Sequence, residues 1–308
     1  MKRLMAALLA LLMLLCGCAR RNAPEAAPAP TPEQYFSITD GALKKREDVK
    51  TLVIGAVAYD SEGNSKLSSV SVLVRSGEDE LSILTIPKDT RVWVEEYDAA
   101  GEYQYSRYGA ISEVYHAAES AQLGEEKLME TVSALLGGVR LDNFMLINAV
   151  QLEKLAQLTD SVMVSVEDPI LEHGIQTGFQ DISPKIAQYA SYSYFNSLGG
   201  VEYSGTDLYK LQRHQQLIVT LLGVFVRRTE RLPEEERMDY VQKIRQCVMT
   251  DMDDETLFSW LNNGMPGIEG ASILTGMQNE SQSSSYWICD QNAVKEWVLA
   301  KFYLTDEE

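Results

Sequence analysis

The chain has 308 residues and is strongly acidic, with 45 Asp and Glu residues against 27 Lys and Arg residues and a formal net charge of −18. This charge argues against broad binding to nucleic acid or to anionic lipid surfaces, because both repel a negative protein. Hydrophobic residues make up 45% of the chain, which is ample for a folded core. The length suits one large domain, or one domain with a C-terminal extension.

The first 17 residues have the pattern of an export signal. Lys2 and Arg3 precede an apolar run over residues 4–15, which is shorter than the ~20 residues that a spanning helix needs. The sequence Leu-Cys-Gly-Cys that ends at Cys18 looks like a bacterial lipobox. We therefore expect a lipoprotein signal peptide and an extracytoplasmic protein that acyl chains on Cys18 anchor to the cell membrane. The alternative is an ordinary cleaved signal with incidental cysteines.

The stretch after Cys18 is rich in Ala and Pro over residues 19–32. Such a composition favours extended conformations and cannot build a core. We expect residues 18–49 to carry the lipid and to act as a tether ahead of the folded part. No later run is long and apolar enough to suggest a transmembrane helix.

The first part of the folded region alternates between strand and helix patterns. Short apolar, β-branched runs predict strands at residues 51–58, 70–74, 81–86 and 91–94. Leu128, Val132 and Leu135 recur at helical spacing and predict an amphipathic helix over 125–136, which the glycine pair at 137–138 ends.

The same alternation continues along the chain. Residues 143–147 and 162–166 have strand character, and Leu152 and Leu155 mark a helix between them. Strands that alternate with helices predict an α/β fold, with a central mixed β-sheet flanked by helices on both faces.

The second half contains a loose segment and a helical tail. Residues 172–205 are polar with interleaved aromatic side chains, which favour either loop packing or a glycan platform. A long helix is predicted over 207–231. The tail is expected to hold a helix from Pro233 to about residue 248, a helix over 254–261, a strand over 286–289 and a last helix capped by Asp290 that ends near Tyr303.

Two cysteines remain after residue 18, at Cys247 and Cys289. They could pair in an oxidising compartment or stay as two buried free thiols. The three histidines are scattered, and no spacing typical of cysteine or histidine metal ligands occurs.

Several local sequences, in this order along the chain, resemble the LytR-CpsA-Psr family of cell-wall glycopolymer transferases. The strand and turn Leu-Ser-Ile-Leu-Thr-Ile-Pro-Lys-Asp-Thr at 81–90 is the most specific of them. The others are 111–118 with 131–138, 141–148, 205–216 and the tail over 250–290. The resemblance covers nearly all of residues 50–303. It implies a three-layer domain over 50–231 and a C-terminal extension, 232–308, packed on the same domain.

The resemblance also implies a function in cell-envelope assembly. Members are implied to move an anionic glycopolymer from a polyprenyl pyrophosphate carrier onto peptidoglycan. A pyrophosphate leaving group needs a divalent cation and arginines around it, an acidic residue and an apolar tunnel for the prenyl chain. The expected partners are thus the membrane through Cys18 and a polyprenyl-linked glycan or peptidoglycan, without nucleic acid.

The resemblance assigns roles to particular residues. Asp89 matches the family's strand-end aspartate, which implies a catalytic and metal-binding role for it. Lys88, its implied catalytic neighbour, stands in place of an arginine and lacks the bidentate fork. Substrate binding is implied for Arg107, Lys210, Arg213, His214 and Gln215.

Other positions depart from the family pattern. Ser68 and Ser69 stand where the family carries an acidic cation ligand, and serines are poor sole ligands for Mg²⁺. The paired arginines ahead of Arg-Gln-Gln are shortened to Lys-Leu-Gln at 210–212, with His214 at the place of the terminal arginine. We therefore expect weak Mg²⁺ binding and no other cofactor.

Two functions remain open. The departures favour a divergent binding or scaffold protein with reduced or no transferase activity, and the alternative is an active Mg²⁺-dependent transferase. On a purely structural interpretation, residues 87–90 form only a turn, and residues 213–215 are only the solvated face of a helix.

Overall fold

The computed structural model describes residues 36, 38, 43–59, 65–77, 80–118, 120–193, 206–262, 267–280 and 285–304. The predicted signal peptide, Cys18, and the aromatic residues Tyr194 and Phe195 lie outside these ranges. Within them, no helix combines the length and the hydropathy that a bilayer span requires.

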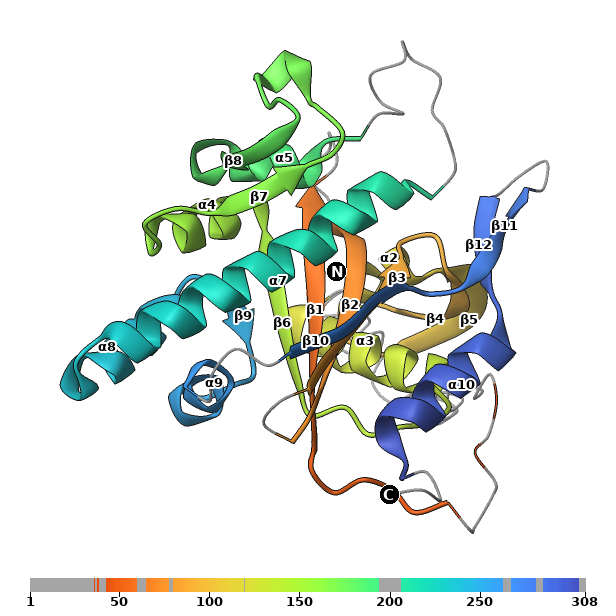
Figure 1. Cartoon of the computed structure of the whole chain (residues 1–308). Helices are drawn as coiled ribbons and strands as arrows, with labels where there is room; N and C mark the ends of the chain where they lie inside the picture. Colours follow the sequence, from red (N-terminus) through yellow and green to blue (C-terminus); the bar gives the residue numbers. More distant parts are fainter. Residues whose placement is uncertain are drawn as a thin grey trace, which may run out of the picture.

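A mixed six-stranded sheet forms the centre of the molecule (Figure 1). In spatial order its strands are β10 (Gly267–Ile273), β3 (Glu80–Pro87), β2 (Ser65–Ser76), β1 (Val49–Tyr59), β6 (Asn143–Asn148) and β9 (Met249–Thr250). β1 runs antiparallel to β2 and parallel to β6, and β10 runs parallel to β3.

Side-chain alternation along the strands gives this sheet two apolar faces. In β3, Leu81 and Ile83 belong to one buried cluster, whereas Leu84 and Ile86 belong to the other. A strand that is buried on both faces has a nearly continuous apolar sequence, which is why these strands were predictable.

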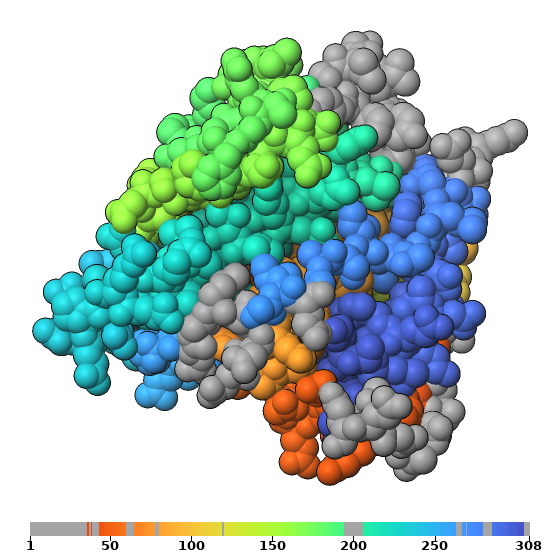
Figure 2. All heavy atoms as spheres, viewed as in Figure 1, coloured from red at the N-terminus to blue at the C-terminus, as the bar shows by residue number. Residues whose placement is uncertain are grey.

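Helices cover both faces, so the predicted α/β fold is confirmed. One face carries α4 (Ala149–Gln157), α5 (Ile186–Ser191), α7 (Leu208–Arg231), α8 (Glu234–Arg245) and α9 (Asp254–Leu261). The other carries α2 (Ile111–Ala117), α3 (Ala121–Leu135), α10 (Gln291–Phe302) and the hairpin of β4 (Arg91–Tyr97) with β5 (Tyr103–Ala110). Figure 2 shows α7, α8 and the segment around α4 as one packed layer over the first face.

The predicted loose segment 172–205 is more ordered than expected in its described part. It contains η1 (Leu171–His173), β8 (Gly178–Asp181), η2 (Ser183–Lys185) and α5. β8 pairs with β7 (Met163–Val166) in a hairpin outside the central sheet. These elements are too short to show periodicity, and burial of Ile175, Ile182 and Ile186 holds them in place.

Capping residues explain where the predicted helices begin. The prediction placed the start of α3 at residue 125, but Ser120 accepts a hydrogen bond from the Leu123 amide and starts the helix earlier. Asp290 caps α10, as predicted, and Asp207 caps α7 through the Lys210 amide.

The C-terminal segment 232–308 contributes to the central sheet. Its strands β9 and β10, which the sequence did not predict, form the two edges, and β11 (Gly276–Glu280) pairs with β12 (Ser285–Cys289) in a hairpin. The residues ahead of β1 pair with the end of α10, where the Arg46 amide donates to the Phe302 carbonyl at 2.9 Å. Cys247 and Cys289 are free thiols.

Candidate functional site

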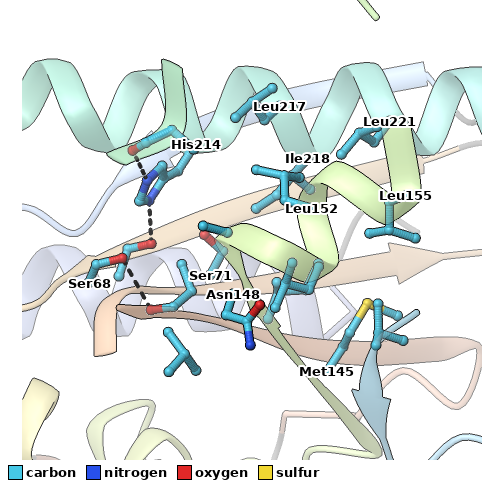
Figure 3. A pocket seen from close by; sticks show the side chains of 18 of the residues that line it. Ser68, Ser71, Met145, Asn148, Leu152, Leu155, His214, Leu217, Ile218 and Leu221 are labelled. Atoms are coloured by element: carbon cyan, nitrogen blue, oxygen red, sulfur yellow. Dashed lines mark hydrogen bonds between the residues drawn. The ribbon is translucent and has the colours of Figure 1, made fainter. Parts of the chain in front are cut away.

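An apolar cavity of about 430 Å³ lies between the sheet and the helices of the first face. Leu52 and Ile54 of β1 line one wall, and Leu217 and Leu221 of α7 line the opposite wall. Leu152 and Leu155 of α4 also point into this space (Figure 3). The cavity is thus an apolar space of the size and composition that accommodate a hydrocarbon chain.

Polar side chains gather at one end of the cavity, which we call the mouth. Here β1 ends, β2 begins and α7 begins (Figure 1). The polar residues that line the mouth are Ser68, Ser69, Asn148, Lys210 and His214. The mouth therefore joins an apolar interior to a polar, positively charged rim.

His214 links three elements at the mouth. Its Nδ1 lies 2.7 Å from Ser69 Oγ, and its Nε2 lies 2.9 Å from the Ala190 carbonyl (Figure 3). A carbonyl can only accept, so Nε2 carries the proton and Nδ1 accepts from the serine hydroxyl. Burial, together with the nearby Lys210 charge, lowers the pKa of His214 to about 3. His214 is therefore a neutral, fully hydrogen-bonded group.

The neighbouring residues Arg213 and Gln215 are also buried, with 6% and 7% of their surfaces exposed. Arg213 Nε donates to the Tyr189 carbonyl at 3.0 Å, and its Nη2 donates to the Tyr192 carbonyl. Gln215 Nε2 donates to the Ser272 carbonyl at 2.7 Å. The interpretation of 213–215 as a solvated helix face is therefore wrong, because these side chains fasten α7 to α5 and β10.

Lys210 carries the positive charge that lines the mouth directly. Burial lowers its pKa to about 8, and the positive charges of Lys88 and Arg213 act in the same direction. Asp207 opposes this shift. Lys88 and Lys210, which are far apart in sequence, are thus close enough to repel each other at this end of the cavity.

Asp89 lies in the turn beside the mouth, since Pro87 is opposite Ser69 in the sheet. Its carboxylate contacts Lys88 Nζ at 3.9 Å and accepts from Thr206 Oγ1 at 3.5 Å. Burial raises the pKa of Asp89, although Lys88 partly offsets the shift. The carboxylate is therefore part of a turn, and it also contacts the ammonium group of its neighbour Lys88 and the hydroxyl group of Thr206 from a distant segment.

Arg107 is not brought to this site. It lies on β5, where its Nη2 is 2.6 Å from Glu113 and 2.7 Å from Glu96. The hairpin of β4 and β5 packs with α2 on the face of the sheet opposite the cavity. Of the predicted site residues that the structure describes, the other six lie on the turn after β3 or in the first two turns of α7.

Asn148, Thr206 and the apolar walls from α4 and α9 were not predicted from the sequence. Asn148 is recognisable as a helix cap, since its side chain accepts from the Gln151 amide. Nothing local indicates that it borders a cavity. Thr206 lies 117 positions from Asp89 in sequence, so only the tertiary fold brings these two residues together.

The donor set at the mouth fits Mg²⁺ poorly. Ser69 Oγ is bonded to His214, and Ser68 Oγ donates to the Ala56 carbonyl at 3.1 Å. Asp89 has Lys88 as its neighbour, whereas Mg²⁺ needs carboxylates or phosphates. Within the described ranges, no group of three or more His, Cys, Asp or Glu residues converges.

The fold and the cavity define a three-layer α/β protein with an apolar cavity and a cationic mouth. Residues 21–300 match the LytR_cpsA_psr family. The chain therefore belongs to the LytR-CpsA-Psr family, a group of cell-wall glycopolymer transferase-like proteins of cell-wall biogenesis.

Solved structures share this fold. B. subtilis TagV aligns with a TM-score of 0.60 and 15% identity over 82% of this chain and 97% of its own. Lin1025 from Listeria innocua aligns with a TM-score of 0.58 and 14% identity over 84% of this chain and 99% of its own. The structure of TagT bound to LI-WTA aligns with a TM-score of 0.59 and 12% identity over 87% of this chain and 99% of its own. Comparison with curated protein sequences yields no significant match.

Proposed function

We propose that this protein binds a polyprenyl-pyrophosphate-linked glycopolymer during cell-wall assembly and has little or no transferase activity. The prenyl chain occupies the cavity, and the pyrophosphate lies at the mouth beside Lys88 and Lys210. The observation that carries the proposal is the continuity between a largely apolar interior and a cationic rim. That combination matches an amphiphile with a hydrocarbon tail and an anionic head.

The charge arrangement at the mouth supports an anionic ligand. Lys88 and Lys210 repel each other, and this repulsion together with burial lowers the pKa of Lys210. A pyrophosphate at this position would favour the charged form of Lys210. TagT, a protein of the same fold, is described with LI-WTA bound, which provides a precedent for a ligand of this kind.

The same geometry supports the proposal that transferase activity is low or absent. Arg213 directs its guanidinium to the carbonyls of Tyr189 and Tyr192, so those donors are already used within the protein. Ser68 and Ser69 offer no carboxylate for a cation. Removal of one preorganised donor typically costs ~10²–10³ in rate, and such losses need not add when residues act as a unit.

The decisive experiment separates binding from turnover. Detergent-solubilised full-length protein is incubated with a polyprenyl pyrophosphate-linked donor, a peptidoglycan acceptor and Mg²⁺, beside the Lys88→Ala and Asp89→Ala variants. We expect the wild type to bind the donor without product above background. Robust turnover that both variants abolish would favour the alternative, an active Mg²⁺-dependent transferase that attaches anionic glycopolymer to peptidoglycan.

The binding measurement uses one cavity variant and one matched control variant. Ala190 lines the cavity on α5, so Ala190→Trp should obstruct the mouth and lower the affinity for the donor by at least about tenfold. Ala121→Trp, at an exposed position on α3, is the control and should bind as the wild type does. Equal binding by both variants would place the ligand elsewhere. Mass spectrometry of lipid that co-purifies with the protein would identify the natural tail.

The proposed location at the membrane rests on the lipobox that ends at Cys18. Cys18→Ala should move the protein from the membrane pellet to the soluble fraction, because each buried methylene of an acyl chain contributes ~0.8 kcal/mol to membrane binding. Cell fractionation followed by immunoblotting measures this shift. A variant that still sediments with membranes as the wild type does would contradict the lipid anchor.

A further inference from the structure

At the end opposite the mouth, the cavity is lined by residues of α8 and α9, and Trp260 is one of them. Resting on the proposed function, we propose that Trp260 closes the far end of the cavity and limits the length of prenyl chain that the protein holds. Trp260 would thereby determine specificity for the part of the carrier that enters the protein.

The position of Trp260 follows from the strands beneath it. The cavity extends along β1 from Tyr59 at the mouth to Leu52 near the start of the strand. The Trp260 carbonyl accepts from Arg75 Nη1 at 3.5 Å, and Arg75 is paired with Lys50 at the start of β1. Trp260 therefore lies at the opposite end of the cavity from the mouth.

A second hollow, of about 400 Å³, lies beyond this end. It is lined by polar residues of the β1 and β6 starts and of α9: Lys50, Asp142, Asn143, Glu255, Thr256 and Ser259. Trp260 is the residue that it shares with the apolar cavity. Trp260 has 4% of its surface exposed and lines both spaces, so it lies between an apolar space and a polar one.

The volume of the cavity sets the length of chain that fits. A methylene group takes about as much space as a liquid water molecule, roughly 30 Å³. The cavity of about 430 Å³ thus holds on the order of 15 carbon atoms, or roughly three isoprene units. Carbon atoms beyond these remain outside the mouth as long as Trp260 stays in place.

Chain-length dependence of binding tests this role. Detergent-solubilised full-length protein is titrated with geranyl, farnesyl, geranylgeranyl and solanesyl pyrophosphate, each in competition with a fluorescent farnesyl pyrophosphate. In the wild type, we expect the affinity to rise at least about tenfold from geranyl to farnesyl and then to change by less than about threefold. In Trp260→Ala, the rise should continue by at least about tenfold from farnesyl to geranylgeranyl.

Two further variants distinguish a specific change in chain-length preference from a general loss of folding. Leu257 lies one turn before Trp260 on α9 and lines the same cavity, so Leu257→Phe should move the plateau to the shorter geranyl chain. Trp297→Ala removes a tryptophan that packs on the opposite face of the sheet, and it should leave the plateau where the wild type has it. Thermal unfolding of each variant confirms that the binding-competent fold is present.

The outcomes separate this inference from the proposed function. Failure of the wild type to bind any prenyl pyrophosphate would remove the proposed function and the length limit with it. Wild-type affinity that keeps rising through solanesyl pyrophosphate would show that the cavity has no closed end. A plateau at the same length in the wild type, Trp260→Ala and Leu257→Phe would also overturn the role of Trp260, while ligand binding itself would stand.

Discussion

Replacement of Lys210 by methionine is expected to weaken binding of farnesyl pyrophosphate by about a hundredfold at pH 7. Lys210 is half-buried and lines the mouth of the cavity, so its ammonium group would bond the pyrophosphate in a site partly shielded from water. Hydrogen bonds to charged groups contribute about 1.5–3 kcal/mol each. Methionine keeps the length and the apolar stem of the side chain and removes the charge.

A matched ligand and a matched variant make this result specific. Farnesol has the same tail without the anionic head, so its affinity should be nearly the same in Lys210→Met and in the wild type. Lys295→Met, at an exposed position of α10 on the opposite face of the sheet, should bind both ligands normally. Competition titration measures all of these affinities. Equal loss of farnesol and farnesyl pyrophosphate binding in Lys210→Met would show a damaged cavity instead of a lost charge.

The same residue predicts a pH dependence. Burial and the nearby Lys88 lower the pKa of Lys210 to about 8 in the free protein. Above that pH the free side chain is neutral, and anion binding must take up a proton. Wild-type affinity should therefore fall above pH 8 by up to about tenfold per pH unit, whereas Lys210→Met should show no such fall. Lys88→Met should move the fall to higher pH, because it removes one cause of the shift.

His214 is expected to make the fold sensitive to acid. Its pKa is about 3 in the folded protein, against about 6.5 for an unperturbed histidine in the unfolded chain. Between these values only the unfolded chain binds the proton. The contribution of His214 to stability is therefore complete above pH 6.5 and is lost as the pH falls, at about 1.4 kcal/mol per pH unit. Between pH 6.5 and pH 4 the loss amounts to about 3 kcal/mol.

Carboxylates also titrate in this range, so a variant must isolate the histidine. In His214→Gln, the amide can donate to the Ala190 carbonyl and accept from Ser69 Oγ, which are the two partners of His214. We expect this variant to lie within about 1 kcal/mol of the wild type at pH 7 and to be relatively more stable by about 3 kcal/mol at pH 4. Urea unfolding at several pH values measures both free energies. A constant difference between the two proteins at all pH values would contradict the buried, neutral histidine.

Much of the fold could be predicted from the sequence because local patterns dictate it. β1 and β3 have apolar runs because both of their faces are buried, and α9 begins after a capping aspartate, Asp253, as expected of a helix start. The position of Asp89 after β3 was likewise predictable, since Pro87 ends the strand. Several family-like segments, in order along the chain, were also sufficient to indicate the family.

The site could be predicted only in part, because it depends on contacts that no local pattern encodes. His214 and Ser69 are 145 positions apart, and neither neighbourhood indicates the other. Arg213 and Gln215 have the composition of a solvated helix face, yet α5 and β10 pack over them. The cavity has walls from β1, β2, β6 and five helices, and Trp260 gains its position only when α9 packs at the start of β1. The sequence by itself thus determined the secondary-structure elements and the apolar face of each. The packing of distant elements decided which apolar residues surround an open cavity, because that depends on how far apart the layers are held.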